Sequence, residues 1–185
     1  MTSDYIAALP AAVRSRFVDN GNGLKMHLLE SGYEHAGHPT VLLLHGFPEL
    51  AFSWRKVMPK LAEAGFHVLA PDLRGYGRTT GWQANYDGEF GSFRMINLVR
   101  DVIGLLAALG HRHVAAVFGH DAGSFIAGWC ALLRPDIFRS VAMMSAPFGG
   151  PPPLEFDTAA APSQRRADIH ADLAALPRPR KHYQW

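Results

Sequence analysis

The sequence of 185 residues predicts an α/β fold built on a mostly parallel sheet, and three observations lead to this prediction. Short apolar runs, each closed by turn or polar residues, are typical of fully buried strands. Helical patterns separate these runs, as expected for a parallel sheet that is covered on both faces. The composition, with 48% hydrophobic and 18% charged residues, is that of a globular domain with one sizeable core.

The first predicted element is a β-hairpin in residues 14–31. Two extended segments flank the stretch DNGNG at 19–23. Asn-Gly pairs favour the tight turns that join antiparallel strands. We therefore expect this hairpin to lead into the main sheet.

Four buried strands should follow the hairpin. Each is an apolar run of strand length that ends in a turn or a polar group. The four runs are 40–47, 67–73, 113–120 and 139–147.

The clearest helix lies between the second and third of these runs. Its apolar side chains recur at helical spacing on one face, and they are Leu98, Val102, Leu105 and Leu109. Gly110 is placed to end the helix. Asp101 lies on the same helix and is expected to be solvated.

The composition changes at Phe148, where a stretch rich in Gly, Pro and Ala begins. We predict a boundary there, with a core in residues 1–147 and a linker with the beginning of a second unit in 148–185. After the linker, one face of a short helix is indicated by Ile169, Leu173 and Leu176.

Charge and cysteine content exclude several classes of protein. The net charge of +2 is spread over mixed signs, which argues against nucleic acid as a partner. No apolar run is long enough for a membrane span, and the first residues do not resemble an export signal. The single cysteine, Cys130, is expected to be a buried apolar side chain. We expect a cytoplasmic protein, and the family resemblance described below implies that it needs neither a metal nor a cofactor.

The stretch GHDAG at 119–123 carries the strongest indication of chemistry. Gly119 and Gly123 flank Asp121 between a predicted strand and a predicted helix. Glycines at these positions let the backbone turn sharply and expose the central side chain, as in a nucleophile elbow. The alternative is a carboxylate that only caps the following helix.

Together with other segments, this stretch resembles the α/β-hydrolase superfamily and, within it, the epoxide hydrolases. The segments are HGFPE at 45–49, PDLRGYGR at 71–78, GHDAGS at 119–124 and SAPFGGPP at 145–152. The resemblance implies an α/β-hydrolase core with a mostly parallel sheet, incomplete at the C-terminus, plus the start of a helical cap. Asp72 and Arg74, in the second segment, are expected to be a structural loop pair.

The resemblance implies a mechanism in two steps. Asp121 would attack an epoxide carbon and form a hydroxyalkyl ester, while a tyrosine of the cap protonates the departing oxygen. The backbone N–H groups of Phe47 and Ala122 would form the oxyanion hole. A water activated by a histidine would then hydrolyse the ester to a diol. Tyr183 is a candidate for the tyrosine.

The resemblance also suggests roles for side chains around Asp121. Trp54 and Pro48 are candidates for substrate binding, and core packing is an equal alternative for Trp54. Five residues are expected to shape the loops rather than to react: His45, Gly46, Gly119, His120 and Gly123.

No residue matches the family's base histidine, and none matches its acid in the usual place. Whether this chain alone is an enzyme therefore stays open, and we expect at most the first step. Ala122 stands where haloalkane dehalogenases have tryptophan, and Asp121 argues against serine esterases. Dehalogenation of a haloacid remains an alternative, as does a non-catalytic truncated fragment.

The strand at 139–147 has a further consequence if the family's later strands are missing. It would form an apolar sheet edge, which can pair with other chains. We therefore expect self-association, or a second chain that completes the sheet.

Overall fold

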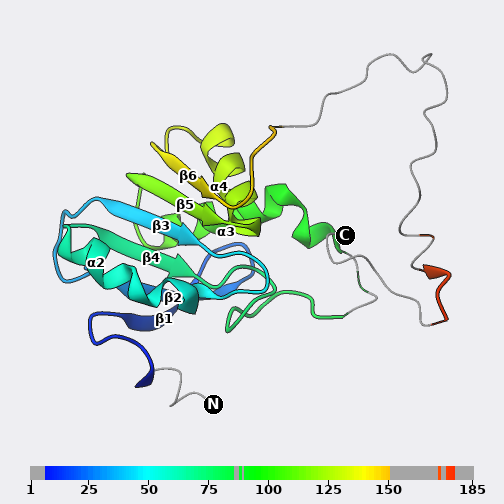
Figure 1. Cartoon of the computed structure of the whole chain (residues 1–185), viewed down its shortest axis with the longest axis horizontal. Helices are drawn as coiled ribbons and strands as arrows, with labels where there is room; N and C mark the ends of the chain where they lie inside the picture. Colours follow the sequence, from blue (N-terminus) through cyan, green and yellow to red (C-terminus); the bar gives the residue numbers. More distant parts are fainter. Residues whose placement is uncertain (1–6, 86–87, 89, 151–170, 172–173, 178–185) are drawn as a thin grey trace. The chain divides into compact units, whose positions relative to one another are not determined.

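The computed structural model describes residues 7–85, 88, 90–150, 171 and 174–177. Residues 1–150 form one compact unit and residues 151–185 a second. All the helices and strands named below lie in the first unit (Figure 1). The predicted linker and cap fall largely outside the described residues, so that assignment stays a prediction.

The hairpin predicted near the N-terminus is confirmed. Strands β1 (Arg14–Asp19) and β2 (Lys25–Ser31) pair antiparallel, with Arg14 opposite Glu30 and Asp19 opposite Lys25. Gly21 and Gly23, in the turn between them, have φ angles of +66° and +80°. Glycine adopts this left-handed region without the steric cost that a Cβ would add.

The described residues form a six-stranded sheet in the order β1-β2-β4-β3-β5-β6. The four strands that follow the hairpin in the sequence run parallel to one another, which confirms the predicted mostly parallel sheet. They are β3 (Thr40–Leu44), β4 (His67–Pro71), β5 (Ala116–His120) and β6 (Val141–Met144). Each strand is shorter than its apolar run. Strands β3, β4 and β6 end before the run does, whereas β5 begins three residues after the run starts.

Helices cover both faces of the sheet, as Figure 1 shows. On one face, Val41 and Leu43 of β3 pack in a cluster with residues of η1 (Ala51–Lys56) and α2 (Met58–Glu63). On the other face, Leu42 and Leu44 pack in a larger cluster with residues of α3 (Met95–Ala108) and α4 (Ala122–Leu133). Successive side chains of β3 enter the two clusters in turn, because neighbouring residues of a strand point to opposite faces of the sheet. The short η2 (Phe90–Phe93) precedes α3.

Helix α3 places its predicted apolar face on the sheet. Val102 and Leu105 are fully buried, and Leu98 and Leu109 pack against the same cluster. Gly110 follows the helix with a φ angle of +78°, as expected for a residue that ends a helix. Cys130 of α4 is buried, as predicted.

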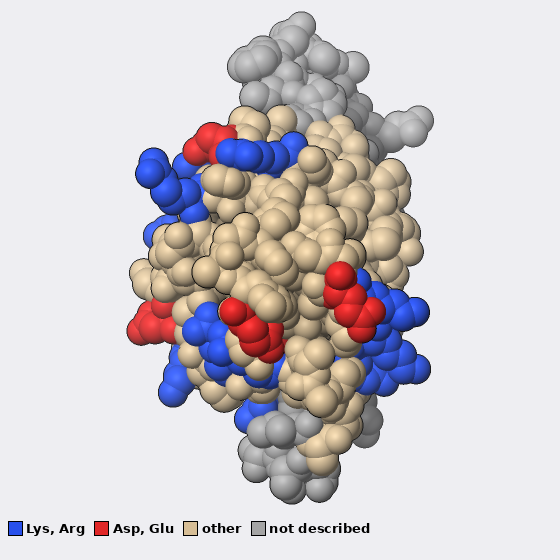
Figure 2. Space-filling model, turned by 90° about the vertical axis from the view of Figure 1, so that its left-hand side faces the viewer, with Lys and Arg blue, Asp and Glu red and all other residues tan. Residues whose placement is uncertain are grey.

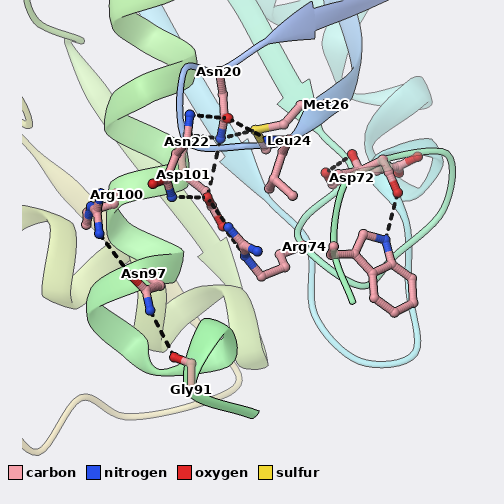
Figure 3. A network of polar contacts seen from close by, with 12 residues as sticks. Asn20, Asn22, Leu24, Met26, Asp72, Arg74, Gly91, Asn97, Arg100 and Asp101 are labelled. Atoms are coloured by element: carbon pink, nitrogen blue, oxygen red, sulfur yellow. Dashed lines mark hydrogen bonds and ion pairs between the residues drawn. The ribbon is translucent and has the colours of Figure 1, made fainter. Parts of the chain in front are cut away.

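The prediction that Asp101 is solvated is wrong. Its side chain is 2% exposed and forms two hydrogen bonds of 2.7 Å with the Arg74 guanidinium, which is itself 7% exposed. Asn22 and Asn20, from the β1–β2 turn, donate to the same carboxylate at 2.7 and 3.3 Å (Figure 3). Burial is tolerated because every oxygen of the carboxylate is paired.

This network also corrects the predicted pairing of Asp72 with Arg74. Arg74 turns instead to Asp101, and joins the loop after β4 to α3. The Asp72 carboxylate binds other partners, which are described below with the site. The two residues therefore belong to different contacts.

Strand β6 is the edge of the sheet that the structure describes, and it pairs there with β5. Val141 and Met143 are 40% and 41% exposed, although both are apolar. An edge strand with exposed apolar side chains is a template for pairing with another chain.

The face of the molecule seen in Figure 2 has a largely uncharged centre. Lys and Arg side chains lie along its margins, and Asp and Glu side chains lie among them. No helix in the described part of the chain is long and apolar enough to cross a membrane.

Candidate active site

Asp121 lies at the tip of the turn between β5 and α4. Its φ and ψ angles are 49° and −119°, in a region that L-residues rarely adopt. Such a conformation costs on the order of 1–3 kcal/mol and persists only where the surroundings impose it. The prediction of a sharp strand-to-helix turn centred on Asp121 thus describes the observed backbone.

Glycines leave the space that this turn needs. A Cβ on Gly119 would collide with the carbonyl oxygen of Gly123, and one on Gly123 would collide with that of Leu44. A Cβ on Gly46 would lie 2.5 Å from the Cβ of Asp121 and 2.7 Å from its Oδ1. The loop after β3 therefore approaches the Asp121 side chain more closely than any other residue type would allow.

Two backbone donors hold the Asp121 carboxylate. The N–H of Phe47 donates to Oδ1 at 2.9 Å. The hydrogen bonds from Phe47 and then Ala122 lower the pKa of Asp121 below its ordinary value, with a smaller contribution from His120. The carboxylate is thus ionised at neutral pH, and its Oδ1 is held by the Phe47 N–H.

Ser124 fastens the turn to the end of β6. Its buried hydroxyl lies 2.8 Å from the carbonyl oxygen of Gly119 and 2.9 Å from that of Met144, and it can donate a hydrogen bond to either. The same hydroxyl accepts a hydrogen bond from the N–H of Met144 at 3.1 Å. The N–H of Asp121 also donates to the carbonyl of Met144, at 3.0 Å. These contacts impose the strained backbone of Asp121.

His45 has both ring nitrogens engaged. Nδ1 donates to the carbonyl of Gly46 at 2.9 Å, and Nε2 accepts from the N–H of Leu73 at 3.0 Å. Burial lowers the pKa of this imidazole, so it stays neutral. His45 therefore ties the loop after β3 to the loop after β4.

His120 precedes Asp121 and pairs with Glu49 of the loop after β3. The distance from Nδ1 of His120 to Oε2 of Glu49 is 3.1 Å, and both side chains are about one third exposed. This contact links the two segments that carry Asp121 and Phe47.

Asp72 anchors the second loop at this edge of the sheet. Its Oδ1 accepts from the N–H of Ala51 at 2.9 Å, and its Oδ2 accepts from the N–H of Arg78 at 2.9 Å. Burial by itself raises the pKa of Asp72, but His27 and these two N–H groups together lower it. Asp72 thus stays charged and holds η1 next to the loop after β4.

The predicted substrate-binding residues occupy two different surroundings. Pro48 is exposed and follows a cis peptide bond with Phe47. Trp54 is half-buried and packs against the cluster on the η1 and α2 face of the sheet. A role in binding stays a prediction for both. Tyr183 lies outside the described residues.

Two residues at this site were not predicted from the sequence. Tyr76 packs edge-on against the ring of His45, with a centroid distance of 4.9 Å. Burial, and then the negative charge of Asp121, raise the pKa of Tyr76, so its phenol stays neutral. Ser124 was missed as well. Tyr76 belongs to the PDLRGYGR segment and Ser124 to the GHDAGS segment. Both segments carry the family resemblance, and this could have marked the two residues as candidates for the site.

Among the described residues, no group of three or more His, Cys, Asp or Glu side chains is placed to hold a metal ion. The chemistry that the described site supports is that of an ionised carboxylate. One of its oxygens, Oδ1, accepts a hydrogen bond from the Phe47 N–H.

A family model described as the α/β hydrolase fold matches residues 39–175. Epoxide hydrolase A of Mycobacterium tuberculosis is 41% identical over 136 residues, which are 74% of this chain and 39% of that protein. Epoxide hydrolase 3 of Siraitia grosvenorii is 41% identical over 129 residues, which are 70% of this chain and 38% of that protein.

The solved structures give the same result. An epoxide hydrolase from an endophytic Streptomyces matches with a TM-score of 0.66 and 42% identity, over 76% of this chain and 39% of that one. The chain thus spans about two fifths of the length of the relatives that it matches.

Proposed function

Since the chain belongs to the α/β-hydrolase fold family, we propose that it opens epoxides by forming an ester on Asp121. The relatives named above are epoxide hydrolases. The observation that carries the proposal is the hydrogen bond of 2.9 Å from the Phe47 N–H to Asp121 Oδ1. It fixes Oδ1, and we therefore assign the attack to Oδ2.

In the first step, Oδ2 of Asp121 forms a bond to an epoxide carbon, and the bond from that carbon to the epoxide oxygen breaks. The released alkoxide takes a proton, and Tyr183 is the proposed donor. The product is a hydroxyalkyl ester of Asp121. A carboxylate with a lowered pKa is ready for this attack at neutral pH without a base.

In the second step, water would attack the ester carbon of Asp121. The carbonyl oxygen that becomes negative is Oδ1, and the N–H groups of Phe47 and Ala122 would stabilise it. This step needs a base, and the described contacts offer none: both nitrogens of His45 are engaged, and His120 pairs with Glu49. We therefore expect the ester to accumulate.

The test is the stoichiometry of epoxide consumption. The purified chain is incubated with styrene oxide, and epoxide and diol are measured by chromatography. The proposal expects about one equivalent of epoxide to be consumed per chain, without matching release of diol. Asp121→Asn should abolish this consumption. Asp136→Asn is the matched control, because Asp136 pairs with Arg134 in an exposed ion pair. Loss of consumption in both variants, or in neither, would contradict the proposal.

We also propose that the edge strand β6 lets this chain associate with another chain. The exposed Val141 and Met143 of β6 favour association of this chain with itself or with a second chain.

A further inference from the structure

Away from Asp121, two consecutive hydrogen bonds link a serine, a histidine and an aspartate. The hydroxyl of Ser15 on β1 lies 2.8 Å from Nε2 of His27 on β2. Nδ1 of His27 lies 2.8 Å from Oδ2 of Asp72, which follows β4. None of these three residues takes part in the contacts that hold the Asp121 carboxylate.

The chemistry of the three groups allows one set of hydrogen bonds that suits a nucleophilic serine. An ionised Asp72 can only accept, so Nδ1 of His27 carries a proton. When Nε2 carries none, it is an acceptor for the Ser15 hydroxyl. This is the order in which a base activates a serine and a carboxylate orients the base.

Burial differs along this chain of bonds in the way such a site requires. His27 and Asp72 are buried, with exposed fractions of 0% and 1%. Ser15 is half-buried and lies on β1, the outermost strand of the sheet on that side. The orienting groups are therefore shielded from water, while the hydroxyl lies near the surface.

The surroundings of Ser15 combine positive charge with an aromatic ring. Nη1 of Arg78 donates to the Ser15 hydroxyl at 3.5 Å. The Arg78 guanidinium lies 5.1 Å from the centre of the Phe17 ring, and the Lys25 ammonium lies 5.6 Å from it. Phe17 is itself exposed. These groups suit a flat aromatic substrate on which negative charge develops.

We propose that Ser15, His27 and Asp72 form a second nucleophilic centre, which accepts an acyl group from activated aryl esters. The Ser15 Oγ forms a bond to the ester carbonyl carbon, and its proton passes to Nε2 of His27. The bond from that carbon to the aryl oxygen breaks, and the aryloxide leaves. His27 then releases its proton to solvent. Acyl-serine, aryloxide and one proton are the products.

This centre is separate from Asp121. Ser15 is on β1 and Asp121 follows β5, and the sheet order places β2, β4 and β3 between them. Four strand spacings correspond to roughly 19 Å. A substrate at one centre therefore does not require the other.

The first test uses p-nitrophenyl acetate with the full chain, an acid quench and peptide mapping by mass spectrometry. We expect acetylation of Ser15 to be about 100-fold faster than that of Ser53, an exposed serine in η1. His27→Gln should reduce it to the rate of Ser53, and Ser15→Ala should remove it. Acetylation of Ser15 no faster than that of Ser53 would overturn the proposal.

Asp121→Asn separates the two centres. It should abolish consumption of styrene oxide while acetylation of Ser15 continues, and Ser15→Ala should give the opposite result. If both reactions disappear together in either variant, the two centres are not independent, and the proposal is wrong.

If His27→Gln does not fold, a second variant, Ser15→Cys, tests the proposal instead. In this variant a thiol replaces the hydroxyl, and the pH dependence of its alkylation by iodoacetamide shows whether His27 lies beside it. A thiol beside a histidine forms thiolate well below the ordinary pKa of about 8.5. Cys130 is an internal reference, because burial raises the pKa of its thiol to about 12. Half-maximal alkylation of the new thiol near pH 8.5 would overturn the proposal.

Discussion

The backbone N–H of Phe47 and the carboxylate of Asp121 are 2.9 Å apart, although 74 residues separate them in the sequence. The contact exists because the loop after β3 passes directly against the turn after β5. Gly46 makes this approach feasible, since it presents no side chain to Asp121. The geometry of the proposed nucleophile thus depends on a neighbour that takes no part in the reaction.

Gly46→Ala should therefore reduce alkylation of Asp121 by styrene oxide. A Cβ there would meet Asp121 Oδ1 at 2.7 Å and displace the carboxylate from the Phe47 N–H. A displacement of about 1 Å can cost about 100-fold in rate. The rate is measured by intact mass over time. Gly149→Ala is the control, because a Cβ at Gly149 meets nothing within 4 Å. Equal rates for the two variants would contradict this explanation.

Asp101→Asn should destabilise the fold by about 3 kcal/mol, because it leaves the buried charge of Arg74 without its partner. The free energy of unfolding is measured by urea denaturation. Asp136→Asn breaks an ion pair whose two side chains are exposed and should leave the stability almost unchanged. If the two variants lose stability equally, Asp101 does not have the structural role assigned to it.

Glu30 should make stability depend on pH in the acid range. Burial opposes its ionisation, but His67 and Arg14, with Arg16, more than offset this and lower its pKa from 4.5 to about 2. The stabilisation, of order 3 kcal/mol, is present above pH 4.5 and is lost as the pH falls towards 2. Urea denaturation at pH 7 and pH 3 measures it.

The matched variants for this measurement are Glu30→Gln and Glu63→Gln. Glu30→Gln should lower stability at pH 7 and weaken the acid dependence. Glu63 is exposed at the end of α2, so Glu63→Gln should retain the acid dependence of the original chain. If stability depends on acid pH in Glu30→Gln as it does in the original chain, the ionisation of Glu30 is not the cause of that dependence.

Met143→Lys should reduce self-association through the edge of the sheet. A charged side chain on an edge strand opposes pairing with another chain. Sedimentation velocity at several concentrations measures the oligomeric state. Ile96→Lys on α3 is the control, since Ile96 is also exposed but lies away from β6. A chain that is monomeric without any substitution would exclude the association.

Most of the fold followed from local pattern. The hairpin, the four parallel strands and α3 each have an apolar period or a turn that identifies them without distant partners. The sharp turn at Asp121 was equally visible, because Gly119 and Gly123 mark it in the sequence. These features depend on residues that are close together along the chain.

What the sequence did not reveal depends on distant pairs. Asp101 looks like a surface residue on an amphipathic helix, and its partner Asn22 is 79 residues away. The role of Ser124 requires Met144 at the end of β6, which a pattern within α4 does not contain. Polar side chains are buried only where tertiary structure supplies partners, so local periodicity cannot predict them.

Locating the adduct left by styrene oxide shows directly whether Asp121 is the nucleophile. The full chain is treated with the epoxide, digested and sequenced by tandem mass spectrometry, with Asp121→Asn beside it. If Asp121 is the nucleophile, one epoxide mass is added to Asp121, and the variant carries no such adduct. Adducts on other side chains with Asp121 unmodified, or the same pattern in both proteins, would contradict an aspartyl ester at this site.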